Sequence, residues 1–150
     1  MKEYIKEKVN SLVKKHGTRD LLELLDAMNI IIVSKPMDDS IHGFYCNIIR
    51  NQIICVNDKL SDEHKKCVIA HELGHAILHK NLNVAFLSCN TFYCIDKFEL
   101  EANIFATELL ITDEMLIDFK TIDESSKTLG IPKNLVELKY KLTFSNIKYS

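Results

Sequence analysis

The chain has no run of about 20 apolar residues, the length that a membrane-spanning helix requires. Its start, Met1–Lys8, mixes charged and apolar side chains and lacks the apolar core of a secretory signal. These two absences predict a cytoplasmic protein that does not associate with a membrane.

A strong charge of either sign is also missing. Lys and Arg number 19 and Asp and Glu number 21, so the formal net charge is −2 over 150 residues. The chain as a whole therefore gives no reason to expect direct binding to nucleic acid. Lysines do gather locally, but acidic and apolar residues separate them, which is typical of solvated faces. These lysines are Lys6, Lys8, Lys14, Lys15, Lys133, Lys139 and Lys141.

The five cysteines are an odd number in a chain without an expected export signal. This favours reduced thiols over a disulfide framework. Cys89 and Cys94 could form a structural metal site or a redox pair, but no second cysteine pair lies beside them. Cys67 lies one helical turn before His71 and could approach a metal there, although burial in the core is usual for a cysteine.

No repeat, low-complexity tract or linker divides the chain, so we expect a single domain over residues 1–150, with short C-terminal helices from about residue 122. The spacing of apolar residues and the position of capping residues predict the helices. They are Lys2–His16, a helix capped by Thr18 to about Asn29, Asp62–His79, Lys97–Leu110, a helix capped by Thr112 to about Phe119, and two short helices within Ile122–Leu142.

Extended segments are predicted between the second and third helices. Ile30–Val33 is β-branched, and Gly43–Ile49 and Ile53–Val56 meet at Arg50–Gln52 as a hairpin. Further short strands are expected at Val84–Ser88 and Phe92–Ile95. The predicted fold class is α+β: mostly helical, with a small antiparallel or mixed sheet of about three strands on the Asp62–His79 helix.

The most informative stretch of that helix is His71-Glu72-Leu73-Gly74-His75. Two imidazoles at i and i+4 project from one helix face and can bind one zinc ion, and Glu72 can take a proton from a water that the zinc activates. Ser61 caps the helix and no proline interrupts it. The alternative is a pair of core histidines satisfied by hydrogen bonds. The spacing favours a hydrolytic metal site with Glu72 as the catalytic residue.

A catalytic zinc ion usually takes a third protein ligand. His79 continues the stripe, but its Cα lies about 12 Å along the helix from that of His71, so one ion cannot easily reach both. Glu99 and Glu101 lie about 200° apart around the next helix, so at most one faces the metal. Asn103 shares the face of Glu99 and could hold a ligand histidine. This arrangement favours Glu99 as the third ligand and leaves Glu101 as the alternative. His79 is then expected to contact a ligand residue or to lie on the surface.

With these residues in hand, the chain resembles the ImmA/IrrE metallopeptidases, and among them the anti-repressor proteases of integrative mobile elements. The zinc motif alone occurs in many unrelated peptidases, but its combination with a downstream Glu-x-x-Ala-x-x-Phe-Ala helix is more specific. The matching residues are His16-Gly17-Thr18, Ile69–His75, Leu78-His79-Lys80, Glu99, Ala102, Phe105–Leu109 and Thr112-Asp113. Where many relatives read Leu-Leu-Met-Pro, this chain reads Leu109-Leu110-Ile111-Thr112, which weakens any transfer of substrate details.

The resemblance implies a zincin-like domain with a gluzincin-like site. In it His71, His75 and Glu99 bind one Zn²⁺ and Glu72 is the general base. It also implies a zinc metallo-endopeptidase that cleaves a helix-turn-helix repressor and so derepresses a mobile element, a prophage or a stress regulon.

Several points stay open at this stage. The oxyanion donor could be Tyr93, His79 or Tyr45. The substrate is expected to add as a strand to the edge of the Gly43–Val56 hairpin. An alternative function is a non-proteolytic module that sequesters its repressor. A DNA-binding regulator is a third, because Ser125–Leu142 has a helix-turn-helix rhythm, but its mixed charge argues against it.

Overall fold

The computed structural model describes residues 1–80 and 92–145, except for the side chains of residues 92–95. The expected strand Val84–Ser88 and Cys89 lie outside the described residues. The elements in chain order are α1 (Lys2–His16), α2 (Leu21–Ala27), β1 (Ile30–Lys35), β2 (Gly43–Ile48), β3 (Asn51–Asn57), α3 (Asp62–Leu78), α5 (Phe92–Leu110), α6 (Asp113–Ile117), α7 (Ile122–Leu129) and α8 (Lys133–Phe144). The predicted α+β class is confirmed.

The sheet has three strands in the order β1-β3-β2 and is mixed. β1 pairs with β3 in parallel and β2 pairs with β3 antiparallel. The hairpin loop is Ile49-Arg50, where φ is 48° and 64°, rather than the predicted Arg50–Gln52. Positive φ at both loop residues is the mark of a type I′ turn, whose usual signal is Asn-Gly. The sequence has no such pair here, which explains the misplaced loop.

Two further predictions were wrong. Helix α2 is capped by Asp20, whose side chain accepts a hydrogen bond from the backbone N–H of Glu23, and not by Thr18. Thr18 instead accepts a hydrogen bond from the backbone N–H of Asp20. The expected strand Phe92–Ile95 is the first turn of α5. No glycine or proline separates those residues from the rest of the helix, so its pattern continues back to Phe92.

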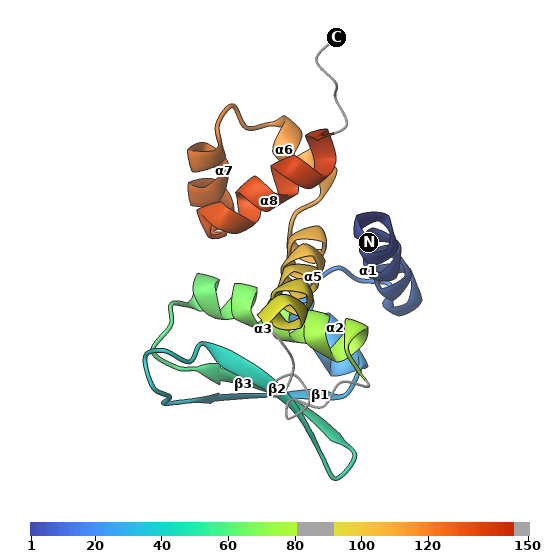
Figure 1. The fold of residues 1–150 in the computed structure, drawn as a ribbon, viewed down its shortest axis with the longest axis vertical. Coiled ribbons are helices and arrows are strands. Elements are labelled where there is room, and N and C mark those ends of the chain that lie inside the picture. The colour runs from blue at the N-terminus through green and yellow to red at the C-terminus, as the bar shows by residue number, and fades with distance from the viewer. Residues whose placement is uncertain (81–91, 146–150) are drawn as a thin grey trace.

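Helix α3 lies between the sheet and α5, and α1 packs beside α5 (Figure 1). The apolar residues of α3 are buried, with Ala70 and Leu73 at 0% exposure. On the sheet side, Gly43 allows β2 to approach α3, because a Cβ there would lie 2.8 Å from Val68 Cγ1. This packing brings β2 alongside the helix that carries the histidines.

Helices α6, α7 and α8 gather at the end of α5 away from the sheet (Figure 1). Lys139 of α8 is buried at 1% exposure, and its Nζ lies 2.9 Å from Glu108 Oε2 and 2.7 Å from Asp113 Oδ1. Lys6 of α1 pairs with the other oxygen of Asp113 at 2.9 Å. The prediction of a solvated face was therefore wrong for Lys139, which fixes α8 to α5 and α6.

Candidate metal centre

Three side chains from α3 and α5 converge on one point. The Nε2 atoms of His71 and His75 lie 3.1 Å apart, and Glu99 places one oxygen 3.1 Å from His71 Nε2 and the other 3.2 Å from His75 Nε2. The structure thus brings together the three residues predicted as ligands. In the part of the chain that the structure describes, they are the one group of three or more His, Cys, Asp or Glu residues that could hold a metal ion.

The spacing of these donors fits a zinc ion. Tetrahedral bonds of 2.0–2.1 Å would place neighbouring ligand atoms about 3.3 Å apart. The separations of 3.1, 3.1 and 3.2 Å are close to that value. Two imidazole nitrogens and a carboxylate oxygen are also a donor set that zinc commonly takes in catalytic sites. The residues therefore fit the metal that the sequence motif implies.

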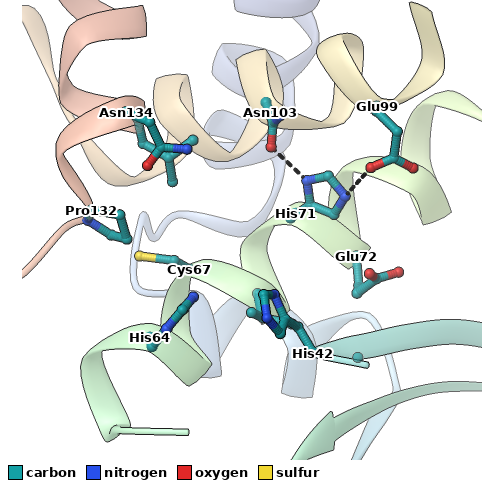
Figure 2. Close-up of a pocket in the computed structure, with 12 residues that line it drawn as sticks. His42, His64, Cys67, His71, Glu72, Glu99, Asn103, Pro132 and Asn134 are labelled. Atoms are coloured by element: carbon teal, nitrogen blue, oxygen red, sulfur yellow. Dashed lines mark hydrogen bonds and ion pairs between the residues drawn. The ribbon is translucent and has the colours of Figure 1, made fainter. Parts of the chain in front are cut away.

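The Nδ1 atom of each of these two imidazoles, on the side of the ring away from Glu99, has a partner of its own. His71 Nδ1 donates to Asn103 Oδ1 at 2.8 Å, as the spacing on α5 indicates (Figure 2). His75 Nδ1 lies 2.9 Å from His79 Nδ1, and His79 Nε2 lies 2.8 Å from Glu101 Oε2. Glu101, which the sequence left as the alternative third ligand, therefore contacts His79, while Glu99 contacts His71 and His75.

The electrostatics of the group reflect these contacts. Hydrogen bonds with His71 and then His75 hold the pKa of Glu99 well below its usual range. Burial lowers the pKa of His71, but the hydrogen bond with Glu99 and the charges of Glu72 and Glu99 outweigh burial, and the net pKa is raised. The site therefore keeps a carboxylate charge beside the ring nitrogens, where a cation would be stabilised.

Glu72 lies next to the donors and is nearly buried, at 9% exposure. Burial raises its pKa above the ordinary range, and the charges of His71 and His75 oppose that effect. The backbone of Tyr45 in β2 also acts to lower the pKa of Glu72, by a smaller amount. A carboxylate with a raised pKa beside a metal-type donor set is suited to taking up a proton and releasing it.

Glu72, His71 and Glu99 line a cleft of about 590 Å³. Most of the lining comes from α3 and α5. His42, just before β2, lines the cleft from the sheet side, and the start of α8 lines it from the side of α5 (Figure 2). The lining residues are His42, Gly43, His64, Cys67, Val68, His71, Glu72, Glu99, Asn103, Pro132, Asn134 and Leu135. The N-terminal turn of α8 therefore faces this cleft.

Reasoning from the sequence missed three polar residues of the cleft: His42, His64 and Asn134. His42 and His64 form an edge-to-face pair with ring centroids 5.3 Å apart. His64 had a usable signal, because it lies seven residues, or about two helical turns, before His71 on α3. His42 and Asn134 had none, since they come from a loop and from a distant helix.

The three residues that the sequence offered as oxyanion donors lie in different surroundings. His79 is buried at 8% exposure and contacts His75 and Glu101, and it does not line the cleft. Tyr45 packs against the hydrophobic core. The side chain of Tyr93 lies outside the described residues. Neither His79 nor Tyr45 is therefore among the residues that line the cleft.

Cys67 does line the cleft, but it is only 4% exposed. Burial raises the pKa of its thiol to about 11. At neutral pH it is a protonated thiol, a weak metal ligand. The side chain of Cys94 lies outside the described residues.

No helix in the described ranges has the length and the hydropathy to cross a membrane.

Comparison with known proteins gives evidence about the family of this chain that does not depend on the geometry of the site. The family model of a peptidase, described as the IrrE N-terminal-like domain, matches residues 25–139. Over 139 residues the chain is 37% identical to immunity region protein 2 of Bacillus phage phi105, which covers 90% of this chain and 88% of the phage protein. Over 113 residues it is 38% identical to metallopeptidase ImmA of Bacillus subtilis strain 168, which covers 75% of this chain and 66% of that protein.

Proposed function

The chain belongs to the ImmA/IrrE family of metallopeptidases, and we propose that it is a zinc-dependent endopeptidase that cleaves a helix-turn-helix repressor. The observation that carries the proposal is the convergence of His71, His75 and Glu99 beside the buried Glu72, at a cleft that His71, Glu72 and Glu99 line. The names of the relatives support a role in an immunity region, where a repressor is the protein to be controlled.

In this proposal His71, His75 and Glu99 hold the metal. When bound, zinc polarises the scissile carbonyl and lowers the pKa of water toward about 7. Glu72 accepts a proton from the attacking water and passes it to the leaving amine. Its raised pKa suits both transfers, because the protonated form is reached without a large free-energy cost.

The sheet offers a place for the substrate backbone. β2 is the outer strand of the order β1-β3-β2, so one of its edges is not used by β3. Gly43, the first residue of β2, lines the same cleft as Glu72. An extended peptide added to that edge would therefore pass the general base. Disruption of the β2 edge without loss of the fold should impair cleavage, and unchanged cleavage would remove this part of the proposal.

The central test is Glu72→Gln, measured with a purified helix-turn-helix repressor from the same genome as the candidate substrate. We expect cleavage to fall by at least about 100-fold, a typical loss for a general base, while the zinc content stays that of the wild type. Glu114→Gln, a change of the same kind at an exposed position on α6, is the matched control and should cleave normally.

A reporter under the repressor separates cleavage from sequestration. If Glu72→Gln relieves repression as well as the wild type does, the chain acts by binding and the peptidase proposal is wrong. If relief is lost together with cleavage, sequestration is excluded.

A further inference from the structure

We propose that His79 and Glu101 form a positioning pair that fixes the proton of His75 on Nδ1 and presents its Nε2 to the metal. The inference rests on the proposed function, because it assumes that His75 is a metal ligand. It adds two residues that have no direct part in holding the ion.

The assignment of protons begins at Glu101. An ionised carboxylate only accepts hydrogen bonds, so His79 must donate from Nε2 across the 2.8 Å contact. A neutral His79 then has a bare Nδ1, which can only accept. That atom lies 2.9 Å from His75 Nδ1, so His75 must be the donor. The proton of His75 is thus on Nδ1 and its Nε2 lone pair is free.

The opposite assignment fails at both contacts. A proton on His79 Nδ1 would point at His75, which would then have to carry its proton on Nε2, the atom that faces Glu99 and His71. The bare Nε2 of His79 would also face the carboxylate of Glu101 without a proton between them. The arrangement with Nδ1–H on His75 satisfies both His79 and Glu101, and it leaves Nε2 of His75 free for the metal.

The surroundings hold the pair in place. The side chain of His79 is 5% exposed and that of Glu101 is 17% exposed, so little water competes for their hydrogen bonds. The ring of Phe98 packs edge-to-face against His79, with centroids 4.8 Å apart. His79 is also the C-cap residue of α3, and its backbone N–H donates to the carbonyl of His75. Ring and backbone of His79 are therefore both tied to the turn that carries His75.

This arrangement gives different tasks to two carboxylates on α5. Glu99 contacts the Nε2 atoms of the histidines, and Glu101 reaches His75 only through His79. His71 has a neutral amide behind it, from Asn103. His75 has an imidazole backed by a carboxylate, an arrangement that raises the basicity of a ligand histidine. The structure thus makes His75 the more strongly donating of the two imidazoles.

The experiment compares zinc affinity, measured by competition with a chelator, in the full chain and its variants. His79→Phe retains an aromatic ring but removes the acceptor, and should weaken zinc binding by about 10- to 100-fold. His79→Gln restores a carbonyl acceptor and should recover most of that loss. His16→Phe makes the same change at the end of α1, outside the cleft, and should bind zinc like the wild type.

Two further measurements separate positioning from packing. Urea unfolding of the metal-free proteins gives the stability that each variant loses without zinc. Long-range ¹H–¹⁵N spectra of the wild type report which ring nitrogen of His79 carries the proton, and the expected result is Nε2.

Three results would overturn the inference: wild-type zinc affinity in His79→Phe, a failure of His79→Gln to improve on His79→Phe, or a proton on Nδ1 of His79. If the wild type itself does not bind zinc, the proposed function fails instead. The two failures are therefore distinguishable.

Discussion

Gly74 of α3 faces Ala102 of α5 so closely that a side chain at this position would fit only if its neighbours shifted by a few tenths of an ångström. A Cβ on Gly74 would lie 3.1 Å from the carbonyl oxygen of Ala102 and 3.2 Å from its Cα. The next residues along the two helices are His75 and Asn103, which both belong to the metal centre. The close crossing therefore sets the distance across which donors on α3 meet donors on α5.

We expect Gly74→Ala to test this crossing. Alanine favours a helix over glycine by about 1 kcal/mol, so an unconstrained site would gain stability. At this crossing the added methyl must push the helices apart, which typically costs about 1–3 kcal/mol. Urea unfolding of the metal-free protein should show a net loss, and zinc affinity should fall with it. A variant that is more stable than the wild type and binds zinc equally well would contradict the account.

Lys139 should be a major determinant of stability. Lys139→Met leaves the buried carboxylate of Glu108 and the oxygen of Asp113 without their ammonium partner, and breaking a buried pair costs about 3–5 kcal/mol. The control is Lys133→Met. Lys133 lies on the same helix as Lys139 and forms an exposed pair with Asp123 of α7, so its replacement should leave the free energy of unfolding almost unchanged. Equal effects of the two changes in chemical denaturation would mean that the buried cluster adds nothing specific.

The same cluster predicts an acid dependence of stability. Hydrogen bonds from Lys139 and then Lys6 hold the pKa of Asp113 well below its usual range. A carboxyl whose pKa is lower in the folded state stabilises the fold above its unfolded pKa of about 3.9, and that contribution is lost as the pH falls toward the folded value. The free energy of unfolding should therefore decline between about pH 5 and pH 2.

Asp113→Asn should flatten part of that decline, because the variant has no proton to take up at this position. Asp123→Asn is the control, since Asp123 forms an exposed pair, and it should keep the slope of the wild type. A slope in Asp113→Asn identical to that of the wild type would show that this carboxyl does not drive the acid sensitivity.

The predictions from sequence succeeded where one helix carries the whole signal. His71 and His75 lie one turn apart on α3, and Glu99 and Asn103 lie one turn apart on α5, so helical geometry alone indicated which side chains share a face. The structure then brings those faces together.

Contacts between distant segments were beyond this reasoning. Lys139 finds its partners 31 and 26 residues earlier in the chain, and nothing in its immediate neighbours indicates burial. His42 reaches the cleft from a loop with no periodicity. The hairpin turn at Ile49-Arg50 uses residues that rarely adopt positive φ, so local preference pointed elsewhere.

The residues that line the cleft come from different parts of the chain. Residues 62–110 contain the converging donors, their hydrogen-bond partners and Glu72, whereas His42, Pro132, Asn134 and Leu135 line the cleft from outside that range. In the proposed function, substitutions at these four residues can change which peptide fits without touching a metal donor. Selectivity and chemistry are thus separately adjustable, and a library of variants at His42 and Asn134 is a direct way to redirect the enzyme to new targets.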